Sequence, residues 1–396
     1  MDRICDKSIC TGCTLCHDIC PSLAIRMSEQ GALGHLRPEI IQEKCIDCKL
    51  CQKMCPAFSC DKSHKTLKVY AAWITDDDRR KGSSSGGVAT EFYDQALQDG
   101  YAITGVKMTA DFGAEMFVST DHRDVMLFKS SKYMQADCRD VYKNCIEFLK
   151  NGKRVLFIGT PCQCAAMQSV AGDKYGDLLI TVELICHGVP SARVFKDYIT
   201  YIEKSKNRKI TSASFRSEVG VEMRLSSKNT ILHQRNWLQD EYLYAFHTGM
   251  LFEECCHNCR YAKTERYPDI TIGDFFKIGS KRPFNKPKCN VSIILINTNK
   301  GQEFLSKCKR LHIEEREIEE ALESNPQLNR PSRISVHREA FQKNFSTQGI
   351  TQAFTATIHK QVRTAQIKAD AKDIIKKSLK AIGLFNIAKK FKRKII

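Results

Sequence analysis

The chain has 396 residues, of which 42% are hydrophobic, and this is enough for two or three domains with a sizeable core. Residues 1–30 hold no apolar export segment, and the apolar runs at 178–186 and 291–296 are too short to cross a membrane, so we expect a cytoplasmic protein. Twenty cysteines without an export signal indicate thiolates bound to metal rather than a disulfide scaffold. The net charge of +17 comes mostly from residues 360–396, which hold twelve Lys or Arg against two Asp.

The cysteine-dense start of the chain contains one motif twice. The two copies are Cys10-x-x-Cys13-x-x-Cys16-x-x-x-Cys20-Pro21 and Cys45-x-x-Cys48-x-x-Cys51-x-x-x-Cys55-Pro56. This run is typical of bacterial ferredoxins, in which the fourth cysteine of each copy binds the cluster of the other copy. By that rule one [4Fe–4S] cluster is held by Cys10, Cys13, Cys16 and Cys55, and the second by Cys20, Cys45, Cys48 and Cys51. A pair of zinc sites is the alternative, but zinc ribbons take their ligands in two pairs and have no reason to repeat this longer pattern.

The sequence predicts an α+β protein of three parts. Residues 1–62 form a small two-cluster ferredoxin domain, residues 63–345 form a larger α/β domain with a mixed sheet flanked by helices, and residues 346–396 form a basic helical tail. Cys5 and Cys60 lie outside the repeated motif, so we expect them to be spare thiols.

Strand and helix patterns alternate through the larger domain. Strands are predicted at 69–75, 101–108, 115–119, 154–159, 178–185, 210–216, 270–274 and 291–297, and helices at 87–98, 139–150, from 161, at 191–204 and from 301. This alternation favours a mixed sheet with helices on its faces. Strand patterns end before residue 346.

A glycine and serine loop lies between the first strand and the first helix of this domain. Residues 79–87 read Arg-Arg-Lys-Gly-Ser-Ser-Ser-Gly-Gly, and such small residues let backbone N–H groups and a helix N-terminus approach an anionic phosphate. A flexible surface loop is the alternative.

Further motifs follow the loop in a fixed order. They are Lys129-Ser130-Ser131-Lys132-Tyr133, Gly159-Thr160-Pro161-Cys162-Gln163, Cys186-His187-Gly188-Val189-Pro190-Ser191, Cys256-x-x-Cys259 and Asp269-Ile270-Thr271-Ile272-Gly273-Asp274-Phe275-Phe276. Over residues 67–310 this order closely resembles the coenzyme F420 hydrogenase/dehydrogenase beta-subunit family, many members of which also carry an N-terminal ferredoxin unit. The resemblance implies FAD, an iron–sulfur cluster, and electron exchange with a soluble deazaflavin or a partner redox subunit. Phe276 departs from the Trp that often stands there in the family.

The resemblance also implies a set of flavin-binding residues. Ser83, Ser84, Ser85, Gly86 and Gly87 would lie at the pyrophosphate of FAD, and Lys129, Ser131, Lys132 and Thr160 along the flavin. For the two lysines, a solvated charged face is the alternative.

A third [4Fe–4S] cluster is predicted on the cysteines inside the matching motifs, namely Cys162, Cys186, Cys256 and Cys259. The C-x₂-C spacing lets two thiolates reach one metal centre, and Cys162 opens a predicted helix whose N-terminus favours a thiolate. Cys255 is the alternative to Cys256. Purely structural cysteines, or half of a zinc site, are the other interpretations.

The end of the chain has apolar residues at helical spacing with lysines between them. The apolar residues are Ile367, Ala371, Ile374, Ile375, Leu379 and Ile382, and the lysines are Lys368, Lys372, Lys376, Lys377 and Lys380. Such a basic amphipathic helix can bind an anionic membrane surface, the protein's own core or an acidic partner.

Taken with the resemblance, the motifs predict a cytoplasmic iron–sulfur flavoprotein oxidoreductase. Its clusters would relay electrons to or from FAD, and FAD would exchange them with a soluble F420-like cofactor or a redox partner. A non-enzymatic electron-carrier subunit is the alternative. A zinc protein that binds nucleic acid is a third interpretation, but the cysteine-rich part lacks interleaved aromatic and basic residues, so no nucleic acid partner is expected. Cys138 and Cys145 are expected to be buried, His187 to be a turn histidine, and no general acid or base is identified.

Overall fold

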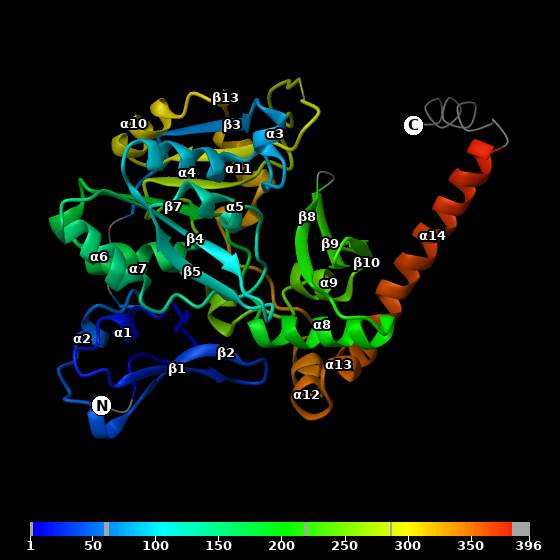
Figure 1. Ribbon diagram of the computed structural model, residues 1–396, viewed down its shortest axis with the longest axis horizontal. Helices are drawn as coiled ribbons and strands as arrows, with labels where there is room; N and C mark the ends of the chain where they lie inside the picture. The colour runs from blue at the N-terminus through cyan, green and yellow to red at the C-terminus, as the bar shows by residue number, and fades with distance from the viewer. Residues whose placement is uncertain (1–2, 59–62, 218–219, 286, 382–396) are drawn as a thin grey trace.

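A computed structural model describes residues 3–58, 63–217, 220–285 and 287–381. Cys60 and Ile382, which entered the predictions above, lie outside these ranges. The N-terminal unit packs below a large central sheet in Figure 1, and the C-terminal helices lie to one side. The predicted α+β class, with a ferredoxin-like unit and a mixed sheet flanked by helices, is confirmed.

The N-terminal unit is built from two short helices and one hairpin. These elements are α1 (Leu15–Asp18), β1 (Ile25–Gln30), β2 (His35–Ile40) and α2 (Leu50–Lys53). Each helix starts after a residue in the left-handed region, Thr14 at φ 70° and Lys49 at φ 59°. The antiparallel hairpin, which the sequence analysis did not predict, separates the two cysteine loops.

The central sheet has eight strands. They are β3 (Lys68–Ile74), β4 (Ala102–Met108), β5 (Ala114–Ser119), β6 (Val155–Gly159), β7 (Leu179–Leu184), β11 (Ile270–Asp274), β12 (Ser292–Ile296) and β13 (Leu311–Arg316), in the order β13-β3-β12-β11-β7-β6-β4-β5. Strands β4, β6, β7 and β11 pair in parallel, and β3 has the same direction because two antiparallel steps through β12 separate it from β11. The carboxyl ends of these five strands therefore meet at one edge, which we call the carboxyl edge.

Helices cover both faces of this sheet. They are α3 (Asp77–Arg80), α4 (Val88–Gln98), α5 (Val125–Phe128), α6 (Val141–Lys150), α7 (Pro161–Ala171), α10 (Asn299–Lys307) and α11 (Ile318–Ser324). Phe157 of β6 packs with Tyr142 of α6 on one face, while its neighbour Ile158 faces the core formed by Phe92 of α4 and Phe304 of α10. This follows from strand geometry, in which successive side chains point to opposite faces.

The predicted strand at 210–216 exists but belongs to a second sheet. It corresponds to β8 (Ser212–Ser217), which pairs antiparallel with β9 (Gly220–Ser227), and β9 pairs with β10 (Thr230–Asn236). Helices α8 (Ala192–Lys206) and α9 (Glu241–His247) flank this sheet, and Phe215 fills the core beneath it. The strand lies in a separate sheet because its partner is β9, the strand that follows it.

Three helices close the chain: α12 (Arg338–Gln348), α13 (Ile350–Thr357) and α14 (His359–Ala381). Phe341 and Phe354 are buried, and Phe354 packs edge-on against Tyr198 of α8. The predicted start of the tail at residue 346 thus falls inside α12. Helix α14 then leaves the body (Figure 1). Among the described residues, no helix combines the length and apolar character that a membrane span requires.

Candidate iron–sulfur and flavin sites

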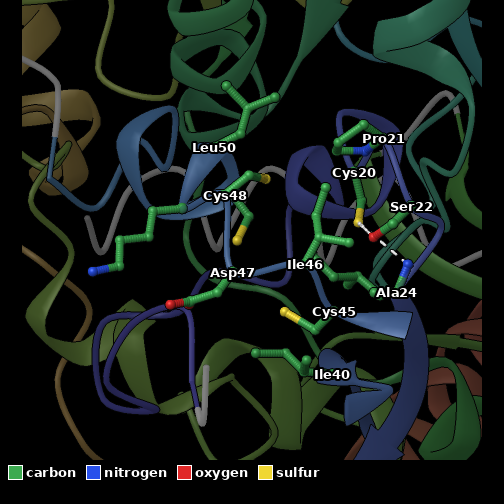
Figure 2. A pocket seen from close by; sticks show the side chains of 13 residues that line it. Cys20, Pro21, Ser22, Ala24, Ile40, Cys45, Ile46, Asp47, Cys48 and Leu50 are labelled. Atoms are coloured by element: carbon green, nitrogen blue, oxygen red, sulfur yellow. Dashed lines mark hydrogen bonds between the residues drawn. The ribbon is translucent and has the colours of Figure 1, made fainter. Parts of the chain in front are cut away.

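Four cysteines line one cavity of the N-terminal unit. They are Cys20, Cys45, Cys48 and Cys51, which we call the second cysteine group, and Figure 2 shows Cys20, Cys45 and Cys48 around the same space. Cys20 follows α1, whereas the other three lie in and before α2, so the cavity combines both copies of the repeated motif. The N–H of Ala24 donates a hydrogen bond to Cys20 Sγ at 3.2 Å, and Cys48 is exposed.

The remaining motif cysteines gather separately. Burial raises the pKa of the Cys16 thiol, and the neighbouring thiols that raise it further are those of Cys13, Cys10, Cys55 and Cys51. We call Cys10, Cys13, Cys16 and Cys55 the first cysteine group. Cys5, predicted to be a spare thiol, hydrogen-bonds with Cys10 and Cys55, and these contacts raise its pKa. The first group therefore has an additional thiol beside it.

The cysteines of the larger domain form a third cysteine group. Burial raises the pKa of the Cys186 thiol, and the neighbouring thiols of Cys256, Cys162 and Cys259 raise it further. Cys162 lies in the first turn of α7, after β6, and Cys186 follows β7, so two adjacent parallel strands present their thiols at the carboxyl edge. The third cysteine group, Cys162, Cys186, Cys256 and Cys259, thus draws on separate stretches of the sequence.

Cys255 and Cys256 both lie close to the third group. Cys255 is buried and hydrogen-bonds with Cys256, which raises the pKa of Cys255, and the Cys162 thiol raises it further. Of the two, Cys256 is the one whose thiol raises the pKa of Cys186. The geometry therefore favours Cys256 as the member of the group, with Cys255 beside it.

The first cysteine group neighbours each of the other two. The Cys51 thiol of the second group raises the pKa of Cys16 in the first group. Burial raises the pKa of Cys13, also in the first group, and the Cys162 thiol of the third group raises it further. Within the described ranges, no three His, Cys, Asp or Glu side chains converge on a single metal ion. The thiolates of a [4Fe–4S] cluster each bind a different iron. The donor set of each group, four cysteines, fits such a cluster.

The glycine and serine loop meets the segment that contains Lys129 and Lys132. Ser84 Oγ lies 2.9 Å from Ser131 Oγ and accepts a hydrogen bond from the Ser131 N–H at 3.0 Å. Ser83 Oγ lies 2.8 Å from Thr90 Oγ1, and Ser85 donates to the Val291 carbonyl at 2.7 Å. The loop and the segment are thus brought together at the carboxyl edge, after β3.

Glycine at position 86 has a packing reason. Its N–H donates to Ser292 Oγ at 2.9 Å, its carbonyl accepts from the Ile74 N–H at 2.8 Å, and a Cβ there would stand 2.3 Å from the Ala72 carbonyl oxygen. The loop therefore packs directly on the backbone of β3 and β12. Gly87 caps α4 in the left-handed region at φ 82°.

Both lysines of the segment hold backbone carbonyls. Lys129 Nζ donates to the carbonyls of Arg79 at 2.7 Å and Lys81 at 2.9 Å. Lys132 Nζ donates to the carbonyls of Leu127, Lys129 and Ser130, at 2.7, 2.8 and 3.2 Å. Burial lowers the pKa of Lys132 to about 7. Lys132 is thus held by the backbone of its own segment.

Thr160 lies beside the third cysteine group. It starts α7 with a capping box, in which the Thr160 N–H donates to Gln163 Oε1 at 2.8 Å, and its hydroxyl lies 3.2 Å from Cys162 Sγ. Cys138 and Cys145 are buried, as predicted, and Gln163 donates to Cys138 Sγ at 3.0 Å.

The N-terminal unit is fixed to the larger domain along β2. The Leu36 N–H donates to Gln135 Oε1 at 2.7 Å, and Gln135 Nε2 donates to the Leu36 carbonyl at 3.0 Å. Arg37 forms a buried ion pair with Glu253, and Arg260, next to Cys259, donates to the Pro56 carbonyl at 3.0 Å. This seam holds the first and third cysteine groups against each other.

One set of polar side chains at the carboxyl edge was not predicted as a site. Arg216 of β8 is ion-paired with Asp274, the last residue of β11, and His187 lies near them. Asp274 lies in the motif 269–276, so the sequence could have marked it as a site residue. No sequence pattern marks Arg216.

Comparison with known proteins agrees with this architecture. The family model for the C terminus of the coenzyme F420 hydrogenase/dehydrogenase beta chain matches residues 152–321, and the corresponding N-terminal model matches residues 69–143. A 4Fe-4S dicluster domain matches residues 9–59. No curated protein matches the chain significantly. Among solved structures, the F420-reducing [NiFe] hydrogenase complex from Methanosarcina barkeri, in a xenon-derivatised form, is similar at 18% identity over 74% of this chain and 91% of that chain, with a TM-score of 0.45. With both halves of the family's beta-subunit model and the dicluster domain matched in order, the chain belongs to the coenzyme F420 hydrogenase/dehydrogenase beta-subunit family and carries an N-terminal 4Fe–4S dicluster domain.

Proposed function

We propose that this protein is an oxidoreductase that relays electrons between [4Fe–4S] clusters and FAD, and onward to a soluble F420-like cofactor or a redox partner protein. The observation that carries the proposal is that the first cysteine group neighbours both the second, which contains the exposed thiol of Cys48, and the third, which lies at the carboxyl edge of the sheet. When bound, FAD supplies the conversion between one-electron and two-electron transfer.

The first and second cysteine groups would each hold one cluster of the dicluster domain. Each group takes three cysteines from one copy of the motif and the fourth from the other copy, and this supports the crossed assignment. Cys48 is the exposed member, so we propose that electrons enter or leave through the second group.

The third cysteine group would hold the cluster nearest to the flavin. Its four thiols come from motifs that lie far apart in the sequence, and their convergence supports a shared ligand rather than separate structural roles. Thr160 and the N-terminus of α7 stand beside Cys162, where both favour a thiolate.

FAD would bind along the carboxyl edge, the usual place for ligands in open α/β sheets. The loop 83–87 ends at the N-terminus of α4, which favours an anionic pyrophosphate, and Ser84 and Ser131 bring the two proposed flavin-binding segments together. The N–H groups of Gly86 and Gly87 already bond within the protein, so their contribution would be the close packing of the loop.

The basic helix α14 would contact an anionic membrane surface. Its first turns dock on the body, because Val362 is buried and His359 Nδ1 lies 2.7 Å from Glu241 Oε1. Beyond the ion pair of Arg235 with Asp370, Ile374 is 64% exposed. An exposed apolar side chain among lysines is the pattern that binds anionic lipid.

Anaerobic purification tests the proposed function. We expect visible absorption that dithionite bleaches, and flavin released on denaturation. A colourless protein that contains zinc would contradict the proposal. If the reduced protein passes electrons only to one-electron acceptors and never to a deazaflavin or another hydride acceptor, the chain is an electron carrier rather than an oxidoreductase.

A further inference from the structure

A part-buried ion pair lies at the carboxyl edge, outside the cysteine groups. Arg216 of β8 donates from Nη2 to Asp274, and the side chains are 11% and 16% exposed. Within the described part of the chain, Arg216 Nε has no hydrogen-bond partner although it is buried. Because a guanidinium carries five N–H donors and burying one without an acceptor is costly, this edge of Arg216 is set up for a further acceptor.

The pair lies between the third cysteine group and the glycine and serine loop. On one side, Asp274 ends β11, and His187, which directly follows Cys186, is close enough for the charges of Asp274 and Arg216 to act on it. On the other side, Tyr133 interacts with both Arg216 and Ser131, and Ser131 bonds Ser84 of the loop. An unbroken set of polar contacts thus links the proposed flavin segments to Arg216.

One aromatic ring, that of Tyr133, lies against the guanidinium. The guanidinium carbon lies 5.7 Å from the centre of the Tyr133 ring, and Tyr133 stacks on Phe246 with ring centres 4.5 Å apart and an angle of 24°. Trp237, 37% exposed, packs on His247, which packs on Phe246, and Phe276, 59% exposed, follows Asp274 by two residues. A cation beside stacked rings with neighbouring uncovered aromatics suits a planar heteroaromatic ligand that can carry negative charge.

We propose that Arg216 binds the ring system of FAD and stabilises its reduced, anionic form. This inference rests on the proposed function, in which FAD is bound. Two electrons and one proton convert the neutral oxidised ring into an anion, and a fixed cation next to the ring favours that product. Asp274 holds one edge of the guanidinium in place and leaves the Nε edge for the acceptor atoms of the ring.

The test compares four proteins: wild type, Arg216→Met, Arg216→Lys, and Arg235→Met as a matched control. Arg235 lies on β10 of the same small sheet, and its ion pair with Asp370 is partly exposed. We measure FAD affinity, the reduction potential of the bound flavin, and iron content. Arg216→Met should weaken FAD binding about tenfold or more, as expected for losing a charge-assisted hydrogen bond, and should lower the flavin potential with iron content unchanged. Arg216→Lys should recover part of the potential, and Arg235→Met should match wild type.

The outcomes separate this inference from the proposed function. If wild type binds no FAD, the proposed function fails and the role of Arg216 with it. If wild type binds FAD and Arg216→Met has the same affinity and potential, only the role of Arg216 is wrong. Should Arg216→Met not fold, Arg216→Gln against Arg216→Lys gives the same decision, because a potential lowered in both to the same extent excludes an effect of the positive charge.

Discussion

Gly86 is the residue whose substitution tests the packing of the glycine and serine loop. A methyl group in Gly86→Ala would stand 2.3 Å from the Ala72 carbonyl oxygen, which belongs to the backbone of β3 and cannot turn aside. We expect a loss of about 1–3 kcal/mol in the free energy of unfolding, as for other overpacked sites. Gly176→Ala is the control, because its Cβ would meet only one atom, at 3.5 Å. Equal unfolding curves for the two variants would show that the loop does not pack as described.

Lys132 is a second residue whose role follows from its contacts. Replacing it in Lys132→Met leaves three backbone carbonyls without their donor. These bonds are exposed or part-buried, so we expect the net loss of ordinary hydrogen bonds, about 0.5–1.5 kcal/mol lower stability in denaturant unfolding. Lys368→Met is the control, because Lys368 is exposed on α14. Lys300 is unsuitable because it also donates to two backbone carbonyls. A stability equal to that control would refute the carbonyl-holding role.

At this scale the sequence predicted some side chains and missed others. The repeated motif is local, so its cysteines could be identified from spacing alone. Lys132 was predicted to lie along the flavin, with a solvated charged face as the alternative, because charge patterns do not show which carbonyls a lysine contacts. Arg216 had no local signal, since its partner Asp274 is 58 residues away in the sequence.

The β2 strand carries the ion pair that fixes the N-terminal unit to the larger domain. Arg37 and Glu253 are 8% and 3% exposed, so Arg37→Met would leave the buried Glu253 carboxylate without its guanidinium, with only His35 Nδ1 at 3.3 Å and the Glu254 N–H beside it. We expect a loss of about 3–5 kcal/mol. Arg26→Met on neighbouring β1 removes an exposed pair with Glu39 and should cost about 0–1 kcal/mol. Denaturant unfolding of the anaerobically purified proteins measures both, and equal losses would mean that the seam does not depend on this pair.

Helix α14 allows a test of the membrane proposal. A cut near Phe354 would remove buried Ile358 and Val362, so the chain should instead end after Asp370, the last residue for which a contact with the body is described. We expect the full chain, but not the shortened one, to sediment with anionic liposomes, and neither with neutral ones. Equal binding of both chains to anionic liposomes would contradict the proposal that α14 binds the membrane surface.

Elements were predicted where the local pattern is strong. The central strands and the helices α4, α6 and α8 follow clear apolar periods, so they were found, and α7 was found from Pro161 at its start. Strand β13 (LHIEER) has only two buried residues, and β2 contains Pro38, so neither shows a strong strand pattern. The separate sheet of β8 was missed because pairing between strands is not encoded in the strand itself.

For the whole molecule, the order of motifs in the sequence predicted the components of the site but not their arrangement. Cys162, Cys186 and the loop 83–87 lie at the same edge because parallel strands place their carboxyl ends there. The sequence indicated these strands, whereas the seam along β2 and the contact between Cys13 and Cys162 depend on how two units pack. Such contacts between distant segments are not visible in local patterns.

The central claim is that three cysteine groups each hold a cluster, and iron analysis tests it most directly. We predict roughly twelve irons per chain in fully reconstituted wild type, and roughly eight in Cys259→Ser, which removes one ligand of the third group. Cys145→Ser, at a buried cysteine outside all three groups, should keep roughly twelve. A wild type with roughly eight irons, unchanged in Cys259→Ser, would contradict the account.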